Sequence, residues 1–115
     1  MIGFSDCKNF VVLEGDNIAP FRLLKSMDNP DLGFLVIDPA IVIKDYYQLV
    51  PEREWDSLGL QDPAAKLVLA ICIIGTTPGN STGNFQAPIL INYQKMIGRQ
   101  VILTEAGLSV RHSLV

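Results

Sequence analysis

The most informative part of the chain is Asn84-Phe85-Gln86-Ala87-Pro88-Ile89-Leu90-Ile91-Asn92. Its alternating pattern predicts a β-strand, because successive side chains of a strand point to opposite faces. One face would pack a core through Phe85, Ala87, Ile89 and Ile91, and the other would carry Asn84, Gln86, Pro88, Leu90 and Asn92. Pro88 has no N–H to donate, so the strand should lie at a sheet edge or be bulged at that residue.

Three side-chain amides lie in this stretch, although a strand does not need polar side chains of this kind to form. An edge strand with ordered amides is suited to contact with another protein. None of the side chains from Asn84 to Asn92 can act as an acid, a base or a nucleophile. The stretch therefore favours protein binding over catalysis.

Short apolar runs separated by turn residues predict further strands on both sides of this stretch. They cover residues 10–13, 21–25, 33–37, 41–43, 66–74, 100–103 and 108–112. The run 66–74 is apolar on both faces, which is typical of a central strand. Residues 75–83 are predicted as a flexible loop, and residues 93–99 as a hairpin connection in which Gly98 can take a positive φ.

Residues 51–59 are predicted to form the one short helix. The segment opens with a proline, carries two acids in its first turn and ends at Gly59, which suits a left-handed C-cap. Trp55 and Leu58 are three residues apart and would share the face that packs on the sheet. The expected fold is mainly β, a small antiparallel barrel-like or sandwich-like domain that spans residues 1–115 as a single unit.

Composition points to a soluble, cytoplasmic protein. The chain has 115 residues, 49% of them hydrophobic and 18% charged, enough for one core and too apolar for disorder. The longest apolar run, Leu67 to Ile74, has eight residues, against the roughly 20 that span a membrane. The first residues, Met1 to Asp6, lack the basic start and apolar region of a signal peptide.

Neither a metal nor a cofactor site is predicted. Two cysteines, Cys7 and Cys72, and one histidine do not make a ligand set. Cys72 lies inside the apolar run and should be a buried small hydrophobe. A Cys7–Cys72 disulfide is the alternative, and a cytoplasmic location argues against it.

Charge is distributed unevenly along the chain. Residues 28–62 hold eight acids against two bases, a net charge of −6, whereas residues 63–115 have a net charge of +3. An acidic surface repels phosphate backbones and suits a basic partner. The alternative is a solvated surface that only keeps the protein soluble.

The sequence does not support an enzyme. His112 is the fourth residue from the C-terminus of the sequence, and no Ser-x-Gly elbow or Cys–His pairing surrounds it. The paired acids Asp28 and Asp31 are explained by a turn. A small β-barrel that binds RNA through aromatic residues is the second hypothesis. Tyr46, Tyr47 and Tyr93 are the candidate surface aromatics, but Tyr46 and Tyr47 lie in the acidic half. A protein-binding module is the leading class.

The chain resembles the FliW family of bacterial flagellar assembly factors. The resemblance rests on residues 81–92, followed by Gly98-Arg99-Gln100-Val101-Ile102-Leu103, with further support from residues 26–39. It implies a mainly antiparallel β-barrel-like fold and a regulator that is not an enzyme. It also implies two protein partners: CsrA, a translational repressor that FliW antagonises, and flagellin. Direct nucleic-acid binding and membrane binding are not expected.

The resemblance also implies binding residues. By matching position, Asn84, Gln86 and Asn92 are the first choice. The second is an acidic surface for basic CsrA, made of Tyr46, Asp45, Glu52, Glu54 and Asp56. The alternative for the amides is that they hydrogen-bond the local backbone and brace the hairpin.

The sequence departs from the family at its start. Family members begin upstream of the segment that Ile2-Gly3-Phe4 resembles, with additional strand sequence. Missing strands would expose a sheet edge and an apolar face. We therefore expect self-association by strand pairing or exchange between copies, or poor solubility.

Overall fold

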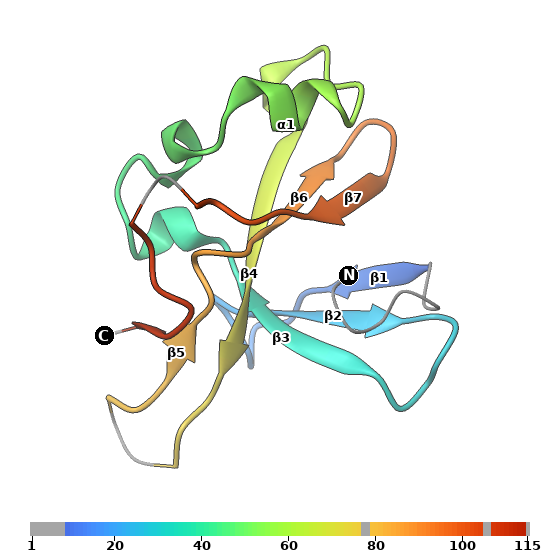
Figure 1. Ribbon diagram of the computed structural model, residues 1–115. Coiled ribbons are helices and arrows are strands. Elements are labelled where there is room, and N and C mark those ends of the chain that lie inside the picture. The colour runs from blue at the N-terminus through green and yellow to red at the C-terminus, as the bar shows by residue number, and fades with distance from the viewer. Residues whose placement is uncertain (1–8, 77–78, 105–106, 115) are drawn as a thin grey trace.

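The computed structural model describes residues 9–76, 79–104 and 107–114, which form a mainly antiparallel β fold (Figure 1). The strands are β1 (Phe10–Leu13), β2 (Arg22–Ser26), β3 (Gly33–Ile37), β4 (Lys66–Ile73), β5 (Thr82–Gly83), β6 (Ile89–Asn92), β7 (Ile97–Gln100) and β8 (His112–Ser113). The helices are α1 (Glu52–Asp56) and the 3-10 turns η1 (Pro39–Ile41), η2 (Tyr46–Leu49) and η3 (Pro63–Ala65).

β4 is the strand to which the rest of the sheet is attached (Figure 1). Its first four residues, 66–69, pair with β6, residues 70 and 71 pair with β3, and residues 72 and 73 pair with β5. β1 and β2 extend the sheet beyond β3, β7 extends it beyond β6, and β8 extends it beyond β5. The mainly antiparallel β prediction is confirmed, but β1 and β7 do not pair, so the sheet is not closed into a barrel.

β4 separates two hydrophobic clusters. Alternate residues Val68, Ala70 and Cys72 face the larger cluster, which we call the helix-side core because α1 and η2 cover it. Leu69 faces the smaller one, which we call the meander-side core, with Leu24, Val36 and Ile89. The prediction that this strand is central and apolar on both faces is confirmed, as is the burial of Cys72.

The short helix packs on the sheet as predicted. Trp55 and Leu58 are both buried in the helix-side core. Gly59 has a φ of 69°; its N–H bonds the Asp56 carbonyl at 2.9 Å, and the Leu60 N–H bonds the Trp55 carbonyl at 3.3 Å. This is the Schellman arrangement that a C-terminal glycine allows. α1 itself is shorter than the predicted 51–59, because residues 57–59 form its closing turn.

The strand predicted at 41–43 is wrong. The Asp38 carboxylate accepts a hydrogen bond from the Ala40 N–H at 3.0 Å, and Pro39 occupies the first turn of η1. An aspartate cap followed by proline starts a helical turn, and this outweighs the β propensity of the residues after it. The chain then leads into η2.

The hairpin between β6 and β7 also differs from the expectation. β7 begins at Ile97 rather than at Gln100, and the residue with positive φ in the turn is Met96, at 55°. Gly98 lies inside β7, where an added Cβ would stand 3.0 Å from the Leu90 carbonyl oxygen. The glycine is needed for close strand approach rather than for the turn.

Candidate protein-binding site

The stretch from Asn84 to Asn92 is not one continuous strand. β5 ends at Gly83 and β6 begins at Ile89. Cys72 pairs with Gly83 and Leu69 pairs with Ile89, so residues 84–88 oppose only residues 70 and 71 of β4. We call residues 84–88 the bulge. A bulge at Pro88 is confirmed, whereas an edge position is wrong because β6 pairs with both β4 and β7.

The bulge changes which core each side chain enters. It inserts an odd number of extra residues, and an odd shift exchanges the two faces of a strand. Phe85 therefore packs in the helix-side core with Leu90, while Ile89 packs in the meander-side core. The predicted single apolar face through Phe85 and Ile89 is wrong for this reason.

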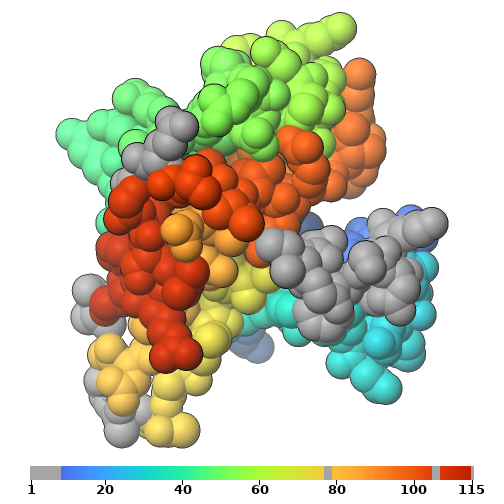
Figure 2. Space-filling view, viewed as in Figure 1, coloured from blue at the N-terminus to red at the C-terminus, as the bar shows by residue number. Residues whose placement is uncertain are grey.

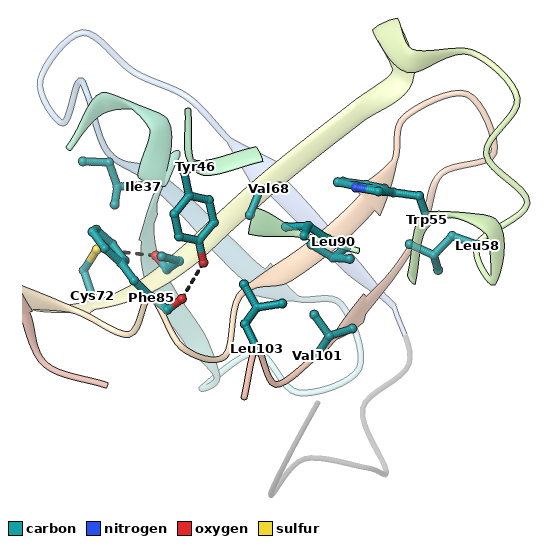
Figure 3. Packing of buried hydrophobic residues seen from close by; sticks show 12 residues of the cluster. Ile37, Tyr46, Trp55, Leu58, Val68, Cys72, Phe85, Leu90, Val101 and Leu103 are labelled. Carbon is teal, nitrogen blue, oxygen red and sulfur yellow. Dashed lines mark hydrogen bonds between the residues drawn. The ribbon is translucent and has the colours of Figure 1, made fainter. Parts of the chain in front are cut away.

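Side chains form hydrogen bonds with several backbone N–H and C=O groups of the bulge. The Asn84 Oδ1 atom accepts from the Ala87 N–H at 3.0 Å, and the Gln100 Nε2 group donates to the Ala87 carbonyl at 3.0 Å. The Tyr46 hydroxyl donates to the Phe85 carbonyl (Figure 3). Buried backbone groups without partners are costly, so these three side chains stabilise an irregular segment.

Backbone contacts complete the bulge. The N–H groups of Val101 and Leu103 donate to the carbonyls of Pro88 and Gln86, at 3.0 and 2.7 Å. The predicted strand at 100–103 is thus an extended segment that follows the bulge after β7 ends at Gln100. Pro88, which lacks an N–H, occupies a position where only its carbonyl is needed.

Asn92 is a structural residue rather than a surface contact. It is 1% exposed. Its Oδ1 atom accepts from the N–H groups of Gln94 and Lys95, at 3.1 and 3.3 Å, and its Nδ2 group donates to the Leu58 carbonyl at 3.0 Å. Asn92 thereby joins the β6–β7 turn to the end of α1, and its amide is buried rather than presented at the surface.

Tyr46, like Asn92, is buried rather than available at the surface. It was expected at the surface, but it is fully buried, and its ring meets Phe85 edge-on with centroids 5.9 Å apart (Figure 3). Burial raises the pKa of Tyr46 above its usual value. Tyr47 is also half-buried: its hydroxyl donates to Asp38 Oδ2 and accepts from the Val68 N–H, both at 2.9 Å. The aromatic surface expected around these residues is absent.

The acids of α1 are partly neutralised. Glu52 forms an ion pair with Lys66 at 2.8 Å, and Glu54 forms one with Arg99 at 3.1 Å. Asp56 is exposed, and no ion pair joins it to a described residue. Asp45 is exposed at the start of η2, apart from α1 in sequence, with a φ of 60°. The acidic surface therefore carries less net charge than the sequence suggests.

Asn84 and Gln86 keep partial exposure, and Asn84 lies on a groove that the sequence did not reveal. We call it the Asn84 groove; its volume is about 220 Å³ and it is lined by Ile71, Ile73, Thr82, Asn84, Val110 and Arg111. The sequence signal was the length of the apolar run 66–74, which continues past the point where β4 leaves the core. Among the predicted site residues, Asn84 alone lines this groove.

The remaining sequence candidates have structural surroundings. His112 stacks on Phe85 with centroids 5.0 Å apart, which explains a histidine near the core. Within the described part of the chain, no group of three or more metal-ligating side chains is found, and no helix is both long and apolar enough to cross a bilayer. Cys7 and the Ile2-Gly3-Phe4 segment lie outside the described residues.

Comparisons with known proteins agree with the fold and with the residue pattern. The family model described as "FliW protein" matches residues 1–114. The flagellar assembly factor FliW of Leptospira interrogans (serovar Lai, strain 56601) is 35% identical over 116 residues, covering 100% of this chain and 77% of the relative. The same-named protein of Geobacter sulfurreducens is 35% identical over 112 residues, covering 97% and 70%. A crystal structure of the flagellar assembly factor FliW superposes with a TM-score of 0.87 at 31% identity, covering 98% of this chain and 79% of that one.

Proposed function

This chain belongs to the FliW family of flagellar assembly factors, and from that premise we propose that it is a non-enzymatic regulator that binds CsrA and flagellin in the cytoplasm. The observation that carries the proposal is the match of sequence and fold over nearly the whole chain. In this scheme flagellin occupies the protein and leaves CsrA free to repress translation. Export of flagellin releases the protein, which then binds CsrA and lifts the repression.

The bulge is the first surface that we propose for partner contact. Asn84 and Gln86 are both partly exposed. The backbone around them is held by defined hydrogen bonds from Gln100, Tyr46 and Leu103. A segment fixed in this way presents its polar groups with little entropy left to lose on binding.

The second proposed surface is acidic. Among the described residues, Asp56 and Asp45 are its acids without an ion pair, while Glu52 and Glu54 have ion-pair partners. A basic partner such as CsrA would have to compete with Lys66 and Arg99 for those two carboxylates. The electrostatic contribution should therefore affect the association rate more than the final affinity.

The deciding experiment is binding of purified CsrA and purified flagellin by calorimetry. The double variant Asn84→Ala/Gln86→Ala should stay folded and bind at least one partner more weakly. Gln61→Ala is the matched control, because Gln61 is an exposed amide remote from the bulge in sequence. A double variant that unfolds more easily, yet binds both partners with unchanged affinity when folded, would contradict the proposed role of the bulge.

A competing RNA-binding function makes the opposite prediction. We expect the protein alone not to retain a flagellin leader RNA on a filter, and to reduce the amount of RNA retained when CsrA is present. Retention of RNA by the protein without CsrA would favour the RNA-binding module.

Self-association is a separate proposal. β1 pairs only with β2 among the described strands, and its Phe10 and Val12 side chains are half-buried against the meander-side core. Such an edge can accept a strand from another copy. Light scattering should show dimers as concentration rises, and a monomer at high concentration would contradict the proposal.

A further inference from the structure

The Asn84 groove lies on the outer face of the sheet formed by β4 and β5. Ile71 and Ile73 are two residues apart on β4 and share this face. Ile73 pairs with Thr82, and the Asn84 N–H bonds the Ile71 carbonyl at 2.9 Å. On the opposite face Cys72 joins the helix-side core, and a Cβ added to Gly83 would stand 2.6 Å from the Phe85 ring.

The floor of the groove is apolar and open to solvent. Ile73 is 64% exposed and Val110 is 52% exposed, whereas Ile71 is partly buried against the meander-side core. In Figure 2 the red C-terminal segment, which carries Val110, borders the yellow end of β4. Exposed isoleucine and valine side chains that lie side by side are typical of interaction surfaces.

The size of the groove favours the side chains of a peptide over a small molecule. Its volume is about 220 Å³, below the roughly 300–1,000 Å³ of small-molecule sites. Its floor follows the strand direction, so residues that alternate along an extended segment match the spacing of Ile71 and Ile73.

The rim of the groove supplies hydrogen-bond donors. The Asn84 Oδ1 atom is engaged by the Ala87 N–H, which leaves the Nδ2 group to donate. Thr82 and Arg111 add a hydroxyl and a guanidinium. No carboxylate of the described residues lies within 4.0 Å of the Arg111 guanidinium, whereas Arg22, Arg53 and Arg99 each have one. The complement of this rim is an anionic acceptor.

We propose that the Asn84 groove binds an extended apolar segment of a partner protein that places an aspartate or glutamate side chain against Arg111. The apolar side chains of the segment cover Ile71 and Ile73, and its carboxylate accepts from the guanidinium and from Asn84 Nδ2. This ligand chemistry is independent of whether CsrA or flagellin is a partner, and it differs from the basic partner that the acidic surface of Asp45 and Asp56 would take.

The test uses capped hexapeptides, so that peptide termini carry no charge. Each peptide has two valines two residues apart and an aspartate beside the second; matched peptides carry asparagine or lysine instead. Binding to the full chain is followed by amide chemical shifts. The shifts should be confined to residues 71–73, 82–84 and 109–111, and the aspartate peptide should bind roughly three-fold more tightly than the asparagine peptide, as exposed ion pairs allow.

Variants separate the two parts of the groove. Arg111→Gln should abolish the preference for aspartate while leaving the apolar contribution, and Ile73→Ser should weaken binding of every peptide. Met96→Ser is the control, because Met96 is an even more exposed apolar residue, at 74%, on the β6–β7 turn. Absence of binding, shifts outside the groove, or an aspartate preference that survives Arg111→Gln would each overturn the proposal.

Discussion

The two ends of the stretch from residue 84 to residue 92 carry the same residue type in the same local arrangement. The side-chain oxygens of Asn84 and Asn92 both accept backbone N–H groups two or three residues ahead. Asn92 is buried, and its Nδ2 group donates a hydrogen bond to the Leu58 carbonyl. Asn84 is partly exposed at the wall of a groove. The two asparagines therefore differ in the burial of the Nδ2 group and not in the local turn. Asn92 braces the fold, whereas Asn84 is a candidate for binding.

The largest expected effect comes from removing the side chain that anchors the bulge. Phe85 is fully buried, between Tyr46 and His112. Phe85→Ala should reduce the free energy of unfolding by about 3–5 kcal/mol, through lost burial and the cavity left behind. Urea denaturation followed by circular dichroism measures it. A loss below about 1 kcal/mol would mean that the bulge is not anchored by the core.

Asn92→Ala should have the next largest effect. It leaves the Leu58 carbonyl and the N–H groups of Gln94 and Lys95 without their partner. We expect a loss of about 2–3 kcal/mol, because the Leu58 carbonyl and the Asn92 site are buried and the two turn N–H groups are only partly open to water. In the same denaturation experiment Gln61→Ala should have no measurable effect, and equal stabilities for the two variants would remove the distinction between Asn92 and a surface amide.

Tyr46→Phe tests the bulge from the opposite side with a smaller change. It removes one hydroxyl and leaves the Phe85 carbonyl without the hydrogen bond it receives from Tyr46. The expected loss is about 1–2 kcal/mol. Because the ring stays, hydrogen exchange should rise at the bulge amides but not in β1 or β2. Uniform exchange across the sheet would show that the hydroxyl acts on global stability instead.

Asn84→Ala should have the smallest effect on stability. It removes one partly exposed hydrogen bond to the Ala87 N–H, which is worth about 0.5–1.5 kcal/mol. Its loss in stability should be smaller than that of Asn92→Ala, while its effect on binding should be larger. Thermal denaturation paired with the peptide titration measures both, and the reverse order would invert the roles that we assign to the two asparagines.

Much of the fold followed from local pattern. β3, β1 and the Gly59 cap match the sequence prediction closely, because alternation, turn residues and a C-terminal glycine act within a few residues. The central position of β4 also followed, since a strand buried on both faces must be apolar on both.

The site depended on contacts between distant residues, which local pattern does not contain. The bulge is held by groups from other parts of the chain: the Tyr46 hydroxyl, the Gln100 side-chain amide and the Ser109 carbonyl, which accepts from the Phe85 N–H at 3.1 Å. Tyr46 looked like a surface aromatic because its neighbours are polar, yet its hydroxyl has a buried carbonyl to bond. The pairing of Glu52 with Lys66 likewise joins residues 14 positions apart, and charge counts along the sequence did not anticipate it.

The pairing of β4 also has a consequence for synthesis of the protein on the ribosome. β1, β2 and β3 are consecutive in the chain and pair in order, so this meander can form as it emerges. β4 follows, but residues 66–69 pair with β6, which arrives about 20 residues later. Until then the apolar face of β4 that β6 and its neighbours will cover is open to water. A nascent chain whose released part ends between residues 74 and 88 should therefore be the one most readily held by chaperones.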